Sequence, residues 1–117
     1  MSVERRYSKR HPMDGDVYIR YRKQRAFPAK AVNCSMQGIY LETKSLTLLT
    51  GALVELEIFR GGNFWEIMGI VSHTSDDGVG VMFWQPQPEL YESVIAKPPR
   101  QADMPPRLRP ETIEGHA

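Results

Sequence analysis

The stretch Val54–Asn63 reads VELEIFRGGN, and it contains a strand and a hairpin turn in immediate succession. Its apolar residues Val54, Leu56 and Ile58 alternate with glutamates, which is the pattern of a strand with one buried face. The adjacent glycines that follow can adopt the positive φ angles of a tight hairpin turn. The stretch therefore predicts an antiparallel hairpin whose second strand runs from Phe64 to His73.

Working outward, the same kind of pattern recurs along most of the chain. Four further strands are predicted, separated by turns, at Val17–Tyr21, Ala26–Val32, Ile39–Thr43 and Gly80–Phe83. Pro28 indicates a sheet edge or a bulge in the second of these strands, because proline cannot donate to a sheet ladder. Six short strands at regular spacing are typical of an antiparallel barrel or sandwich. We therefore predict an all-β fold.

One helix is expected, over Glu89–Ala96, because prolines precede and follow this segment. Leu90 and Val94 would pack it against the barrel, with Tyr91 and Ile95 beside them. Residues 97–117 are rich in proline and contain no aromatic residue, so we predict a disordered tail.

Composition narrows the class of protein. A chain of 117 residues suits a single domain, and no apolar run approaches the ~20 residues that span a bilayer. The single cysteine excludes an internal disulfide and suggests a reducing cytoplasm. The histidines and the cysteine lack the spacing of metal ligands, and no nucleophile lies in a recognisable pattern with a base. We expect no metal, no cofactor, no membrane insertion and no enzymatic activity.

Charge is distributed unevenly along the chain. The net charge is only +1, yet the first 30 residues carry an excess of six positive charges and the remainder a net charge of −5. This asymmetry suggests that the N-terminal segment meets an anionic partner. We therefore divide the chain into a flexible basic arm (1–12), a β-barrel with its helix (13–96) and the tail (97–117).

Two motifs give that partner a chemical identity. Residues 6–10 read RYSKR, an RxxxR pattern, and residues 33–38 read NCSMQG, an NxSxxG pattern. Together they resemble the RxxxR and [D/N]xSxxG signatures of the PilZ domain family, and the glycine-rich stretch Gly78–Phe83 resembles the closing strand of that family. The resemblance covers residues 5–96. It implies a six-stranded antiparallel split β-barrel with one C-terminal helix, which binds the bacterial messenger cyclic di-GMP.

The motif residues have the chemistry that a cyclic guanine dinucleotide needs. The guanidinium groups of Arg6 and Arg10 can form paired hydrogen bonds with guanine O6 and N7 or with phosphate. The oxygens of Asn33 and Ser35 can accept from guanine N1–H and N2–H₂, although either residue is also an ordinary turn former that bonds its own backbone. Gly38 would permit close approach or a positive φ angle.

The resemblance extends the site to two more residues. Arg5 occupies the position before RxxxR, where a basic residue is associated with a ligand dimer, so we hypothesise two cyclic di-GMP molecules per chain. His73 lies near the end of its strand, where related domains place an aromatic residue against a base. A solvent-exposed Arg5 and a surface His73 are the simpler alternatives. Cys34, between the motif positions, is expected to face the barrel interior.

The resemblance therefore implies a cytoplasmic cyclic di-GMP receptor, with motility, biofilm formation, pili, exopolysaccharide and virulence all open as the process that it serves. Binding would order the basic arm over the barrel and alter a surface read by an unidentified downstream protein, with the receptor a monomer or weak homo-oligomer. Two alternatives stay open. One is a PilZ-like protein that acts in pilus or motility assembly without ligand. The other is a nucleic-acid-binding β-barrel, although the chain lacks the interleaved aromatic and basic residues of such surfaces, so no nucleic acid is expected.

Overall fold

The computed structural model of the chain describes residues 9–22, 25–44 and 48–96. These residues form seven strands and one helix. In chain order the elements are β1 (His11–Pro12), β2 (Asp16–Arg20), β3 (Phe27–Cys34), β4 (Gly38–Glu42), β5 (Leu53–Arg60), β6 (Asn63–Ser75), β7 (Gly78–Phe83) and α1 (Pro88–Ala96).

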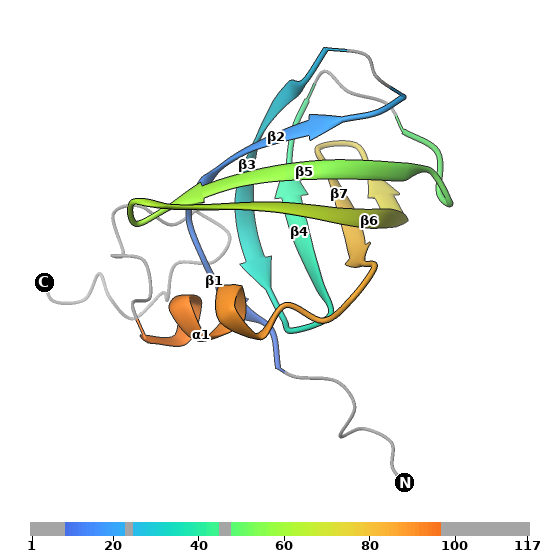
Figure 1. Cartoon of the computed structure of the whole chain (residues 1–117). Coiled ribbons are helices and arrows are strands. Elements are labelled where there is room, and N and C mark those ends of the chain that lie inside the picture. The colour runs from blue at the N-terminus through green and yellow to red at the C-terminus, as the bar shows by residue number, and fades with distance from the viewer. Residues whose placement is uncertain (1–8, 23–24, 45–47, 97–117) are drawn as a thin grey trace, which may run out of the picture.

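The strands close into one antiparallel barrel (Figure 1). Their order is β1-β3-β2-β5-β6-β7-β4, and an additional pairing of β3 with β4 joins the two sides of the sheet. Closure removes the exposed edges that an open sheet would present. The predicted six-stranded antiparallel barrel with one C-terminal helix is confirmed, with β1 as a short seventh strand.

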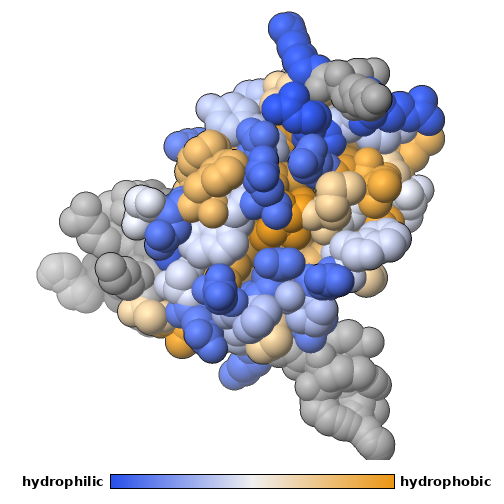
Figure 2. All heavy atoms as spheres, in the orientation of Figure 1, coloured by the Kyte–Doolittle hydropathy of each residue, from blue (hydrophilic) through white to orange (hydrophobic). Residues whose placement is uncertain are grey.

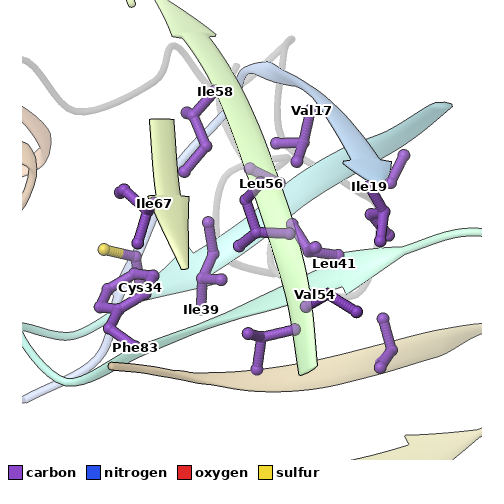
Figure 3. Close-up of a cluster of buried hydrophobic side chains, with 14 of the residues drawn as sticks. Val17, Ile19, Cys34, Ile39, Leu41, Val54, Leu56, Ile58, Ile67 and Phe83 are labelled. Carbon is purple, nitrogen blue, oxygen red and sulfur yellow. The ribbon is translucent and has the colours of Figure 1, made fainter. Parts of the chain in front are cut away.

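The alternation in the sequence creates the core. Val54, Leu56 and Ile58 point inward from β5 and are at most 1% exposed, and Val17 and Ile19 on β2 are fully buried. Figure 3 shows these side chains meeting those of β3, β4, β6 and β7 inside the barrel. Burial of this apolar surface is the main stabilising contribution to such a fold.

The β5–β6 hairpin forms as its glycines predict. Gly61 and Gly62 have φ angles of 59° and 82°. Positive φ at both central residues matches a type I′ turn, whose twist suits the flanking strands. The β2–β3 connection has no glycine, and Arg22 adopts the left-handed conformation there with a φ of 56°. Lys23 and Gln24 of this predicted turn lie outside the described residues.

The end of β3 differs from the prediction. We expected this strand to stop at Val32 and the turn to begin at Asn33, but β3 continues to Cys34. Its register against β4 shifts between Ala31 and Asn33, so Val32 is the extra residue of a β-bulge. Without the bulge, Asn33 would share the inward face of Ala31. The bulge reverses the alternation, so that Asn33 faces outward and Cys34 is fully buried, as expected for Cys34.

The segment before β2 is also anchored. His11 and Pro12, which we assigned to the arm, form β1 and pair with Cys34 and Asn33. Met13 follows with no exposed surface, and its amide donates to the carbonyl of Val32. The C-terminal end of the predicted arm is therefore held against the end of β3.

Helix α1 lies beside β1 at one end of the barrel (Figure 1). Leu90, Tyr91 and Val94 are buried, as predicted, whereas Ile95 is 48% exposed and does not pack as we expected. Among the described residues, no helix has the length and apolarity to cross a membrane.

The outer surface mixes charged and apolar groups (Figure 2). One cluster of exposed aromatic residues spans β2, β5 and β6. The ring centroids of Phe59 and Phe64 are 4.8 Å apart, and those of Tyr18 and Phe59 are 6.1 Å apart in an edge-on arrangement. Such pairs stabilise neighbouring strands even when they are partly solvated.

Candidate functional site

Two of the predicted ligand residues are in direct contact. The Nη1 atom of Arg10 donates a hydrogen bond of 2.8 Å to Oδ1 of Asn33, although 23 residues separate them in the sequence. The pairing of Pro12 with Asn33 in β1 and β3 brings the two segments together. The contact is exposed to solvent, so both side chains can also meet a ligand.

Ser35 forms the turn between β3 and β4. Its amide donates to the carbonyl of Gly38 at 2.8 Å, and its Oγ accepts from the amides of Gln37 and Gly38 at 3.2 Å each. These bonds are the local side-chain-to-backbone contacts that define such turns. Ser35 therefore has the structural role that we considered as its alternative, while its hydroxyl proton can still donate to an acceptor in the adjacent cleft.

Gly38 is required by space rather than by backbone conformation. A Cβ atom at this position would lie 2.7 Å from the carbonyl oxygen of Val81 and 3.6 Å from Nη2 of Arg10. Its φ angle is not among the positive ones. The absence of a side chain lets β4 approach β7 and leaves room for the guanidinium group of Arg10 beside it.

Three of these residues border a cleft of about 340 Å³ on the outside of the barrel, and the fourth, Asn33, is bonded to one of them, Arg10. Arg10, Ser35 and Gly38 line one part of it, and Ser72, Met82 and Pro86 line another. A guanidinium group and hydroxyl groups therefore converge beside the apolar surface of Met82, a residue that is 54% exposed. Convergent polar groups on a partly apolar wall are typical of a ligand site.

Two larger hollows lie elsewhere on the barrel. One, of about 610 Å³, includes Arg20, Leu53 and Met68, and the other, of about 430 Å³, includes Asp16 and Lys30. Neither contains a residue of the two motifs. We place the candidate site at the smaller cleft because Arg10, Ser35 and Gly38, which come from both motifs, line it together. The volume of a hollow does not by itself indicate a ligand site.

Arg10 gives the cleft a positive charge, and the thiol of Cys34, which faces the barrel interior rather than the cleft, is unreactive. Burial raises the pKa of the Cys34 thiol to about 12, although the positive charges of Arg10 and Arg60 act in the opposite direction. Such a thiol stays protonated at neutral pH and is a poor nucleophile. The described part of the chain contains no group of three or more His, Cys, Asp or Glu residues that would hold a metal ion.

The structure thus brings together Arg10, Asn33, Ser35 and Gly38. Arg5 and Arg6 lie outside the described residues. His73 is exposed on β6, where it pairs with Gly80 of β7, and it does not line the cleft.

Sequence reasoning did not assign the far wall of the cleft to the site, and Ser72 and Met82 of that wall illustrate why. The register of β6 against β7 shifts between Val71 and His73, which makes Ser72 the extra residue of a second bulge. A bulge of this kind leaves no clear signal in the alternation of a short strand. The outward position of Met82, between the buried Val81 and Phe83, was in contrast readable from the pattern of β7.

The fold and the candidate site together define a small closed β-barrel with a cleft between Arg10, the β3–β4 turn and the strands β6 and β7. Comparison with known families is more specific. The family model of the PilZ domain matches residues 4–97. The chain therefore belongs to the PilZ domain family, whose domains bind or regulate rather than catalyse.

Solved structures show the same fold. The PilZ domain of CeSA from a cellulose-synthesizing bacterium superposes with a TM-score of 0.61 at 14% identity, over 75% of this chain and 92% of that one. The Bacillus subtilis inhibitor of motility MotI/DgrA gives 0.60 at 16% identity, over 81% of this chain and 49% of that one. An uncharacterized Legionella protein gives 0.51 at 13% identity, over 75% and 91% of the two chains. No curated protein sequence matches.

Proposed function

We propose that this protein is a bacterial receptor for cyclic di-GMP and that the nucleotide binds at the cleft beside Gly38. The observation that carries the proposal is the meeting of Arg10, Asn33 and Ser35 from two distant motifs on one side of the barrel. Membership of the PilZ family supports a regulatory binding role.

The chemistry of the site suits a guanine dinucleotide. The planar fork of Arg10 can donate two parallel bonds to guanine O6 and N7 or to a phosphate. Oδ1 of Asn33 already accepts a hydrogen bond from Arg10, so the two side chains lie side by side. Together they would offer a ligand the N–H donors of Arg10 and the amide group of Asn33. Met82 offers a polarizable apolar surface to the face of a base.

Arg5 and Arg6 complete the proposal. They precede Lys9, the first described residue, so ligand contacts from them would fold the basic arm over the same cleft. Ligand free energy would offset the entropy of ordering the arm. Two stacked ligand molecules per chain remain our hypothesis for the stoichiometry, with a downstream protein in the cytoplasm reading the ordered arm.

The proposal is tested by calorimetric titration of cyclic di-GMP into the wild-type protein and into Arg6→Ala and Arg10→Ala variants. Each variant is expected to lose at least about tenfold in affinity, because a guanidinium fork on a base or phosphate is worth ~1–3 kcal/mol. Arg25→Ala is the matched control, since Arg25 is exposed and does not line the cleft. It removes the same charge and is expected to bind as the wild type does.

Three results would overturn the proposal. Wild-type protein that does not bind at millimolar nucleotide would indicate a ligand-independent PilZ domain. Equal losses in the Arg10 and Arg25 variants would show a general charge effect. Steep salt dependence with equal binding of unrelated oligonucleotides would favour a nucleic-acid-binding barrel. Fitted stoichiometry of one nucleotide per chain would refute the ligand dimer alone.

A further inference from the structure

Tyr91 connects the C-terminal helix to the first described residue of the chain. Its hydroxyl donates a hydrogen bond of 3.0 Å to the backbone carbonyl of Lys9, although 82 residues separate the two. The Tyr91 ring also contacts that of His11, with centroids 5.6 Å apart and planes inclined by 59°. Tyr91 is only 8% exposed, so its position is determined by the packing of α1.

These two contacts lie on either side of Arg10. The carbonyl of Lys9 and the amide nitrogen of Arg10 belong to one planar peptide unit, so holding the carbonyl also fixes the start of residue 10. His11 is fixed a second time by its pairing with Cys34 in β1 and β3. Arg10 is therefore clamped at both of its ends while its side chain reaches Asn33.

The helix that provides the clamp is itself attached to the barrel. Leu90 and Val94 are fully buried, and Arg60 at the end of β5 donates from Nη1 to the carbonyl of Ser93 at 3.1 Å. Tyr91 thus attaches the segment around Arg10 to the barrel, although this segment contributes only the two-residue strand β1. The position of Arg10 depends on a residue that belongs to neither motif.

We propose that Tyr91 is a positioning residue for the cyclic di-GMP site, which holds Arg10 in its binding conformation before the ligand arrives. This inference rests on the proposed function. A residue fixed in advance loses less conformational entropy on binding. The hydroxyl group of Tyr91, rather than its ring alone, supplies the hydrogen bond that matters.

The first test is independent of ligand. In Tyr91→Phe the ring remains and the bond to Lys9 is lost, so the backbone order parameters of Arg10 and His11, measured by ¹⁵N relaxation, are expected to fall. Tyr18→Phe is the matched control, because Tyr18 is 39% exposed on β2 and packs against Phe59. Unchanged order parameters in Tyr91→Phe would overturn the inference whether or not the nucleotide binds.

The second test measures the coupling to Arg10. Tyr91→Phe is expected to weaken cyclic di-GMP binding about 3- to 10-fold, the effect of one net hydrogen bond. In an Arg10→Ala background the same substitution should cause no further loss of affinity, because the side chain that Tyr91 positions is absent. Equal losses in both backgrounds would assign Tyr91 a merely structural role. If the wild type fails to bind, the proposed function falls and the relaxation measurement still decides the clamp.

Discussion

Arg60 supplies the positive charge that helix α1 lacks at its C-terminal end. Its Nη1 atom donates 3.1 Å to the carbonyl of Ser93, and the last turn of α1 contains no basic residue of its own. The last carbonyls of a helix have no intrahelical partner and form the negative end of its dipole. A buried arginine from β5 therefore performs the capping role that a local lysine or arginine often has.

The first prediction concerns this cap. Arg60 has a side chain only 7% exposed and also lies 3.4 Å from a carboxylate oxygen of Asp14 through Nε. Replacing it with methionine is expected to lower the free energy of unfolding by about 1.5–3 kcal/mol, since a charged hydrogen bond and an ion pair are lost from a buried position. Urea denaturation followed by circular dichroism measures the change.

A matched substitution at an exposed pair calibrates that result. Arg20 contacts Glu57 at 3.3 Å, but its side chain is 38% exposed. Arg20→Met should cost less than about 1 kcal/mol, as solvent-exposed ion pairs usually do. If both variants lose the same stability, burial of Arg60 is not what gives its contacts their value.

Gly38 provides the second prediction. In Gly38→Ala the added methyl group would meet the backbone oxygen of Val81 at 2.7 Å, and a backbone atom cannot rotate away. We expect a loss of about 1–3 kcal/mol in the free energy of unfolding and a loss of nucleotide binding, because Gly38 lines the cleft and β4 would have to move away from β7. Gly80→Ala is the control, since its Cβ atom would make only ordinary contacts of 3.5 Å or more. A Gly38 variant as stable as the Gly80 variant would contradict this packing.

The third prediction concerns the buried thiol. Cys34 is fully buried and burial raises its pKa to about 12. At pH 8 the native protein should therefore resist a thiol reagent that labels the unfolded chain at once. Rapid labelling under native conditions would show that the end of β3 opens readily. That result would contradict the anchoring of this segment by β1.

The same shift has a consequence for stability at high pH. The pKa of Cys34 is about 12 in the folded protein, whereas the ordinary pKa of the thiol is 9.0. The unfolded chain therefore releases this proton first as the pH increases. Stability due to the protonated thiol is fully present below pH 9 and is lost progressively up to pH 12. Between pH 9 and pH 12 the free energy of unfolding of the wild-type protein should fall by about 1 kcal/mol more per pH unit than that of Cys34→Ala. Parallel slopes for the two proteins would contradict the shift.

Local signals explain why much of the fold was predictable. The alternation of Val54, Leu56 and Ile58 and the paired glycines Gly61 and Gly62 depend only on near neighbours in sequence, and each produced the expected strand and turn. The closure of the barrel then follows from giving each strand a partner. Arg10, Asn33, Ser35 and Gly38 could be named in advance as candidate site residues because two short motifs mark them, and the fold places them close together.

Nonlocal contacts explain what was missed. The bulge at Val32 exists because β3 pairs with β4 in a shifted register, and the two-residue strand His11–Pro12 exists only because β3 lies beside it. The bond between Tyr91 and Lys9 joins opposite ends of the barrel sequence. None of these features has a periodicity or a spacing of its own, so only the folded chain reveals them.

The last prediction uses the position at which this chain carries an amide. Asn33→Asp would turn the 2.8 Å bond from Arg10 into a charge-assisted one and give guanine two acceptor oxygens in place of one. Cyclic di-GMP affinity should rise about 3- to 10-fold by calorimetry, because short-range hydrogen bonds outweigh the added repulsion from the phosphates. Asn63→Asp, with the same change of charge at the β5–β6 turn, should leave affinity unchanged. A decrease confined to Asn33→Asp would mean that residue 33 faces a phosphate rather than a base edge.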